Sequence, residues 1–290
     1  MIELIYKIYT SSFCIDNFLS LLTQIHRRKN VGLWTLTHFY QIIPSFLIFA
    51  LLSILAAKIL GKAQPSVRYI PLQIIAVTLL VLEAIKQINA VSNGSYNLYA
   101  LPFHYCSLFL YFLPFHAFYH GKYSRIINVA SLAFLASLML DMLITPTVIY
   151  TDDNIRNFFN AYYDFHTVAF HNLVVFYFML TVALKLYEKK DKSDLKILSV
   201  FISIYLVIAT TLSYTLKVNF HNLYRCNVAF IDNVRVAMVE SIGIFGTILY
   251  VLILSVLTLI FTSFSYYATH SAISGIDKLV AKFKQKQEKK

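Results

Sequence analysis

Long apolar windows separated by short polar segments dominate the chain. Seven windows are long enough to cross about 30 Å of hydrocarbon at about 1.5 Å per residue. They lie at 35–60, 69–91, 99–120, 126–150, 165–188, 196–220 and 237–267. None alternates polar and apolar residues with the period of two that a barrel strand requires, so each predicts a helix that satisfies its own backbone. The pattern predicts an all-α polytopic membrane protein with about seven transmembrane helices.

The two ends of the chain differ from this central region. Residues 1–32 mix apolar side chains such as Phe18 with polar ones such as Asp16, which predicts an N-terminal interfacial amphipathic segment. No basic start is followed by a clean apolar core, so we expect no cleavable signal peptide. Residues 33–270 form the predicted transmembrane domain, and 271–290 a basic cytoplasmic tail. A Lys-rich end after a membrane helix is typical of a topology anchor that senses anionic lipid, so we expect no nucleic-acid partner.

Composition and charge agree with a membrane protein and orient it. Hydrophobic residues make up 58% of the chain and charged residues 13%, against about 25% charged in soluble domains, which excludes a soluble enzyme. The chain has 25 Lys+Arg and 14 Asp+Glu. Eight basic residues fall in the N-terminal segment and the loops on its side, and sixteen in the opposite loops and the C-terminal tail. The positive-inside rule therefore predicts a multi-pass protein of the cell membrane with the N-terminus outside and the C-terminus cytoplasmic.

Ionisable side chains at membrane depth are costly, and here they gather in one leaflet. With the predicted orientation, the polar residues of helices two to seven lie near their outer ends. This predicts an outward-facing polar cavity lined by at least five helices. The residues predicted to line it or to position a substrate are Glu83, Lys86, Asp141, His166, Asn219, His221 and Glu240.

Cys106 is the candidate nucleophile of this cavity. Pro102 fits the first turn of a helix, and the unpaired N–H groups and positive end of that helix favour a thiolate at Cys106. On a helix His104 would point about 200° away from Cys106, which argues against His104 as the direct base. The base then comes from another helix, with His171 the best-placed candidate and His166 the second.

Structural roles are the alternative for each of these residues. A lone buried Cys is often an apolar filler, a buried His often links helices, and Glu83 and Lys86, one turn apart, form a typical structural ion pair. Their coincidence at one depth favours a functional cluster. The three cysteines, Cys14, Cys106 and Cys226, show no paired metal spacing, and we expect no structural disulfide.

Three segments resemble the YwaF-like family of bacterial integral membrane proteins, whose animal relatives include a transmembrane acyltransferase acting on lysophospholipids. Residues 101–106, Leu-Pro-Phe-His-Tyr-Cys, resemble the family's Leu-Pro-x-His-x-Cys helix opening. Residues 143–146, Leu-Ile-Thr-Pro, resemble its Leu-Leu-Thr-Pro helix end, and 162–175 its aromatic run into a His-bearing helix. Residues 218–223 are a looser match to an Asn-Tyr pattern.

The resemblance implies a Cys/His lipid acyltransferase. Cys106 would attack a phospholipid acyl ester, His171 would take its proton, and the thioester would pass to a lysolipid hydroxyl. His104 or Asn219 would donate to the oxyanion or position the ester. Water as the acceptor would make the same site a lipase. The expected partners are membrane phospholipids or lysophospholipids, and no cofactor is expected. The oligomeric state is left open by the sequence.

Two other readings remain open. In a transporter or lipid-binding protein, Glu83, Lys86, Asp141 and Glu240 would form an ion or headgroup pathway and Cys106 would only pack; the absence of an internal repeat counts against it. A metal site would use the histidines His104, His166, His171 and His221, but no HExxH or CxxC spacing supports one, so no metal is expected.

Overall fold

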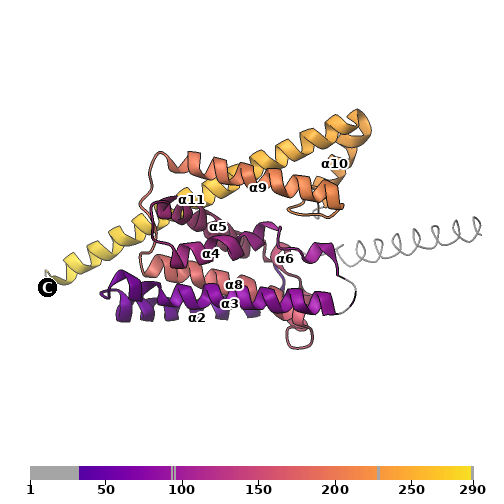
Figure 1. Ribbon diagram of the computed structural model, residues 1–290. Helices are drawn as coiled ribbons and strands as arrows, with labels where there is room; N and C mark the ends of the chain where they lie inside the picture. The colour runs from indigo at the N-terminus through magenta and orange to yellow at the C-terminus, as the bar shows by residue number, and fades with distance from the viewer. Residues whose placement is uncertain (1–32, 93, 95, 227–228, 289–290) are drawn as a thin grey trace, which may run out of the picture.

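The computed structural model describes residues 33–288, apart from 93, 95, 227 and 228, and within them the chain forms helices joined by loops (Figure 1). The α-helices are α2 Leu36–Leu60, α3 Pro65–Ser92, α4 Phe109–Phe118, α5 Ser124–Ile144, α6 Pro146–Ile149, α7 Asp152–Arg156, α8 Tyr162–Ala183, α9 Asp194–Leu216, α10 Ala229–Ile242 and α11 Ile244–Glu288. Two 3₁₀ turns, η1 Leu98–Ala100 and η2 Tyr105–Leu108, precede α4. The predicted interfacial segment 1–32, with Cys14, lies outside the described residues.

Six of these helices are long and apolar enough to cross a membrane. They are α2, α3, α5, α8, α9 and the part of α11 up to Lys282, and the apolar segment Tyr105–Phe118 is a shorter seventh. This confirms the all-α polytopic membrane fold. The window 99–120 does not form the single helix that we predicted. Leu101 is extended with ψ 139°, because the following Pro102 disfavours helical geometry in the residue before it. His104 is also extended, with ψ 157°.

Helix α5 is the centre of the bundle. Its residues 128–138 are all buried, where a surface helix would bury one stripe. It packs against α4, α8, α9 and α11, while α2 and α3 lie outside α8 and α4 (Figure 1). Small residues such as Ala130 and Ala133 allow this close approach. The bundle therefore has α2 and α3 on one flank and α9 and α11 on the other.

Two further predicted windows end differently in the structure. Helix α5 stops at Ile144, and Pro146 begins the separate helix α6. The seventh window is divided at Gly243, whose φ of +58° turns the chain between α10 and α11. Glu240 therefore does not open the seventh spanning helix: it lies exposed on α10, which packs against α11. The predicted tail at 271–290 continues α11 as helix to Glu288.

The first described residues and the end of α11 lie at opposite ends of the bundle (Figure 1). The indole of Trp34 donates to the carbonyl of Leu143, so the start of α2 lies beside the end of α5. At the other end, the fully buried carboxylate of Asp194 joins three helices. It pairs with Arg125 of α5 at 2.6 Å and accepts a hydrogen bond from the Tyr266 hydroxyl of α11 at 2.8 Å.

Removing this carboxylate should destabilise the bundle. In the Asp194→Ala variant, the Arg125 guanidinium and the Tyr266 hydroxyl lose their shared acceptor, and a buried hydroxyl left without its partner costs about 1–3 kcal/mol. Thermal unfolding in detergent should show a clearly lower Tm than for Lys192→Ala, an exposed change in the preceding loop. Equal Tm values for the two variants would contradict a stabilising role for the Asp194 carboxylate.

Candidate functional site

The chain between α3 and α4 is the one part of the described membrane crossings that runs inside the bundle without regular α-helix. We call residues 97–108 the Cys106 loop. Gln87, five residues before the end of α3, donates to the Ala100 carbonyl at 2.7 Å, so the loop lies about 8 Å inside that helix end. Non-helical backbone at such a position is tolerated only when it is buried in protein or lines a cavity.

Side chains hydrogen-bond four backbone carbonyls of this loop. Besides Gln87, the Tyr205 hydroxyl of α9 donates to the Phe103 carbonyl at 3.4 Å and the Tyr111 hydroxyl of α4 to the Pro102 carbonyl at 3.1 Å. The His104 ring bonds the Tyr99 carbonyl at 3.0 Å. The donors come from α3, α4, α9 and the loop itself. The loop is therefore a fixed element of the fold.

A buried carboxylate organises the α3 side of the loop. Glu83, only 8% exposed, pairs with Lys86 at 2.7 Å and with His166 Nε2 of α8 at 3.2 Å, and accepts from Gln87 at 2.6 Å. The Tyr96 hydroxyl donates to Gln87 in turn, at 2.5 Å. The structure thus brings together three of the predicted residues, from α3 and α8.

Cys106 is half-buried in η2, directly before α4. It therefore lies at the N-terminal end of α4, where the helix dipole is positive.

Hydrogen bonds define which ring nitrogens are available. A carbonyl oxygen only accepts, so His171 Nδ1, 2.7 Å from the Thr167 carbonyl, carries a proton, and the Nε2 of the neutral ring has a lone pair. The same reasoning gives His104 a proton on Nε2, shared with Tyr99. That N–H is used inside the loop, so a neutral His104 has no N–H left for an oxyanion. The helical argument that turned His104 away from Cys106 does not apply, because His104 is extended and Cys106 lies in a 3₁₀ turn.

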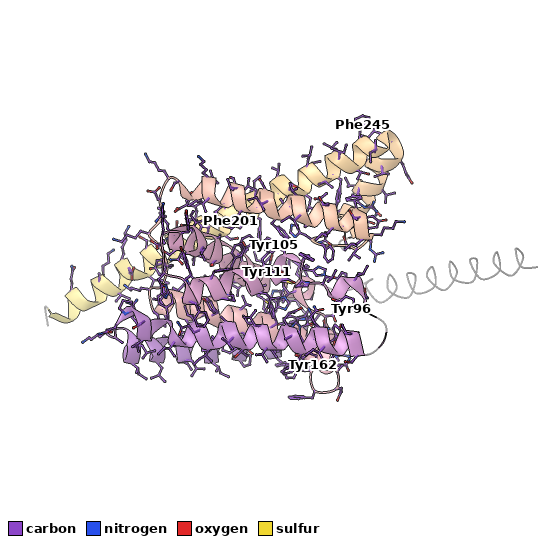
Figure 2. All side chains as sticks on the ribbon, in the orientation of Figure 1. Tyr96, Tyr105, Tyr111, Tyr162, Phe201 and Phe245 are labelled. Atoms are coloured by element: carbon purple, nitrogen blue, oxygen red, sulfur yellow. The ribbon has the colours of Figure 1, made fainter. Side chains whose placement is uncertain are left out.

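The other flank of the loop meets α9 and α11 (Figure 2). The Tyr105 hydroxyl bonds Thr262 of α11 at 2.7 Å, and its ring stacks on His221 at 5.1 Å between centroids. His221 Nε2 donates to Thr258, whose hydroxyl donates to Leu254. His221 and Asn222 adopt positive φ values of 51° and 59°, which cost about 1–3 kcal/mol each in non-glycine residues. Such strain, beside the loop, is typical of a functional site.

The remaining predicted residues are Asp141, Asn219 and Glu240. Asp141 is half-buried on α5. Asn219 is buried, and its side-chain oxygen accepts the Arg225 N–H at 3.1 Å. Its carbonyl therefore holds the loop between α9 and α10 in shape. Glu240, exposed on α10, is not part of this cluster.

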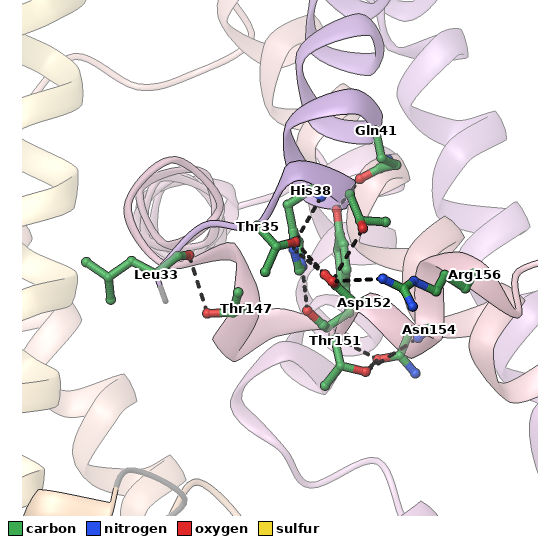
Figure 3. Close-up of polar contacts among 11 residues, drawn as sticks. Leu33, Thr35, His38, Gln41, Thr147, Thr151, Asp152, Asn154 and Arg156 are labelled. Atoms are coloured by element: carbon green, nitrogen blue, oxygen red, sulfur yellow. Dashed lines mark hydrogen bonds and ion pairs between the residues drawn. The ribbon is translucent and has the colours of Figure 1, made fainter. Parts of the chain in front are cut away.

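Figure 3 shows a second polar network, which sequence reasoning missed, around His38 and Asp152. His38 is fully buried: its Nδ1 lies 3.1 Å from Asp152, and its Nε2 donates to the Tyr150 carbonyl at 2.8 Å. The Tyr150 hydroxyl donates to Gln41 at 2.7 Å, and the Tyr150 ring lies 6.2 Å from that of His171. A His near the start of an otherwise apolar window was the one signal in the sequence. The network joins α2 and α7 to the His171 end of α8.

A groove of about 420 Å³ lies between α9 and α11. Its lining is mainly apolar, with the hydroxyls of Ser203, Thr210, Thr211 and Ser255. None of the predicted site residues lines it, so the predicted polar residues form a packed cluster around the Cys106 loop instead of the wall of this groove. In the described part of the chain, no three His, Cys, Asp or Glu side chains are grouped to hold a metal ion.

These features define a multi-pass, all-α membrane protein with a half-buried cysteine on a broken crossing. The family model described as the TMEM164 family matches residues 33–266, and the chain belongs to that family. No curated protein and no solved structure matches the chain.

Gln87 should control the exposure of Cys106. In the Gln87→Leu variant the buried Ala100 carbonyl loses its donor, at a cost of about 1–3 kcal/mol, and the Cys106 loop loosens. With Cys14 and Cys226 replaced by Ser, a small maleimide should then alkylate Cys106 several-fold faster.

The matched control is Gln73→Leu. Gln73 is on the same helix and donates to the Ala117 carbonyl at the far end of α4, at 3.2 Å. This variant should leave the alkylation rate unchanged. Equal rates for both variants would show that Gln87 does not fix the loop.

Proposed function

We propose that this protein is a lipid acyltransferase that uses Cys106 as its nucleophile and His171 as its base. The observation that carries the proposal is the position of Cys106: half-buried in η2, at the positive end of α4. A helix N-terminus favours a thiolate. Membership of a membrane-protein family agrees with a lipid substrate.

His171 supports the proposal through its tautomer. With Nδ1–H held by Thr167, Nε2 takes the thiol proton as Cys106 Sγ attacks the ester carbonyl of a phospholipid. The C–O bond then breaks, and the lysolipid oxygen leaves with the proton from His171. In the second half, an acceptor hydroxyl gives its proton to Nε2, attacks the thioester and releases the thiol. Water as the acceptor would release a fatty acid, so a lipase shares this mechanism.

The alternative of a carboxylate-lined transport path has less support. It needs Glu83, Asp141 and Glu240 along one route, but Glu240 is exposed on α10 and Glu83 is occupied by three donors.

An acyl-enzyme assay tests the proposal. Purified protein in detergent, incubated with a phospholipid carrying a radiolabelled acyl chain, should acquire label that hydroxylamine removes. Cys106→Ala should abolish the label, and His171→Gln should slow its appearance by about 10²–10⁴-fold, because the base is lost.

Cys226→Ala is the matched control, since it removes another half-buried cysteine from the loop before α10. It should label like the wild type. Equal label in the folded Cys106→Ala variant, or none in the wild type, would reject the proposal.

We further propose that the protein lies in the cell membrane with the start of α2 outside and the end of α11 in the cytoplasm. The sixteen basic residues against eight in the sequence support this orientation. In a cysteine-free background, an impermeant maleimide should label Asp153→Cys on intact cells. Lys192→Cys, at the opposite end of the bundle and equally exposed, should react only after permeabilisation. The reverse pattern would invert the topology.

A further inference from the structure

We propose that the end of α11 is an amphipathic anchor that bends at Ser274–Gly275 and lies on the surface of an anionic membrane. The anchor consists of the residues of α11 after Gly275, 276–288, which we call the tail helix. This inference does not rest on the proposed acyl transfer, because the tail helix shares no residue with the Cys106 loop.

The tail helix extends beyond the bundle. The Tyr266 hydroxyl of α11 donates to Asp194, the first residue of α9, so Tyr266 is level with an end of the spanning helices. From Tyr266, α11 continues to Glu288, over about 33 Å. Figure 1 shows this part of α11 running past the other elements. An ion pair of Asp277 with Lys185, at 3.5 Å, connects it to the loop after α8, but exposed pairs contribute little to stability.

One face of the tail helix is apolar and uncovered. Ile276, Leu279 and Val280 are spaced as i, i+3 and i+4, so they lie on one face of the helix. These side chains are 59%, 57% and 48% exposed. In a straight α11 they stand about 15–21 Å beyond the level of Tyr266, where the spanning helices have ended. A membrane that covers those helices therefore does not cover this face unless the tail helix changes direction.

The charge of the tail helix favours an anionic lipid surface over a second copy of the chain. Lys278 and Lys282 are exposed on the face opposite the apolar residues. From 276 to 290 the sequence holds six lysines and two acidic residues. Two such helices would repel each other. An amphipathic helix with lysines on its polar face instead binds anionic lipid, with its apolar face buried at the boundary of headgroups and acyl chains.

Ser274 and Gly275 provide the bend. A glycine in the interior of a helix destabilises it relative to alanine, and sharp kinks occur at Gly/Ser pairs. Packing does not explain this glycine, because a Cβ at Gly275 would meet no other part of the described chain within 4 Å, its own helical turn aside. The pair lies between the bundle and the apolar face of the tail helix. A bend at this point lays that face along the membrane.

Spin labelling of the full chain in vesicles tests the anchor. In a cysteine-free background, Leu279→Cys or Ala281→Cys carries a nitroxide. Both positions are exposed and they lie about 200° apart on one turn of α11, so Ala281 is the matched control. The vesicles contain phosphatidylcholine alone or with an equal part of phosphatidylglycerol. The readout is the ratio of collision rates with oxygen, which enters lipid, and with a nickel chelate, which stays in water.

With phosphatidylglycerol, the oxygen-to-nickel ratio should be several-fold higher at Leu279 than at Ala281. In phosphatidylcholine alone the two ratios should be similar. Changing Lys278 and Lys282 to Gln should lower the ratio of bound to free tail helix by about 5-fold per lysine. Gly275→Ala should also reduce the difference between the two labels, because alanine stiffens the helix at the bend.

Four results would overturn parts or all of this proposal. Equal ratios at both positions in both kinds of vesicle would show that the tail helix stays in water. An equally high ratio at Leu279 in neutral vesicles would exclude a role for charge. Shielding of Leu279 from both reagents, with dipolar broadening that dilution by unlabelled protein abolishes, would identify a second copy as the occupant. An unchanged difference in Gly275→Ala would reject the bend at Ser274–Gly275.

Discussion

The need to satisfy every backbone polar group inside a membrane protein governs this structure. Six long helices meet it within their own segments. The Cys106 loop does not, and its carbonyls depend on side chains from α3, α4 and α9. A broken crossing of this kind persists only when the surrounding helices hold it. The positions of Gln87, Tyr111 and Tyr205 therefore follow from the loop that they support.

The same loop joins the two flanks of the bundle. On one side, the Glu83 cluster connects α3 to α8 through His166. On the other, Tyr105 connects the loop to α11 through Thr262 and stacks on the strained His221. Glu83, Lys86 and His166, which would be costly in lipid, are placed where each has a charged partner. Contacts from both flanks of the bundle thus meet at the loop whose 3₁₀ turn η2 carries Cys106.

Much of the fold was predictable because hydropathy is a local property of the chain. Apolar length alone located the six spanning helices and identified the segment with Cys106 as a crossing. The break in that crossing also had a local cause, in Pro102 and its effect on Leu101. The turn at Gly243, with its positive φ, places Glu240 on a separate helix. The sequence prediction missed this turn, because the hydropathy of a long window hardly changes with one glycine.

The sequence by itself therefore determined the membrane class, the approximate spans and the set of polar residues near one end of the bundle. Only the tertiary structure decided which of those residues meet. Glu83 and His166 are 83 positions apart in the sequence, and His38 and Asp152 are 114 apart. The hydrophobic period of a helix does not predict contacts between residues so far apart in the sequence. The hydrogen bond of His171 to Thr167 was within reach of helical spacing, but the direction of its free nitrogen was not. Side-chain partners depend on how the helices rotate and pack against α5, and this is a property of the whole bundle.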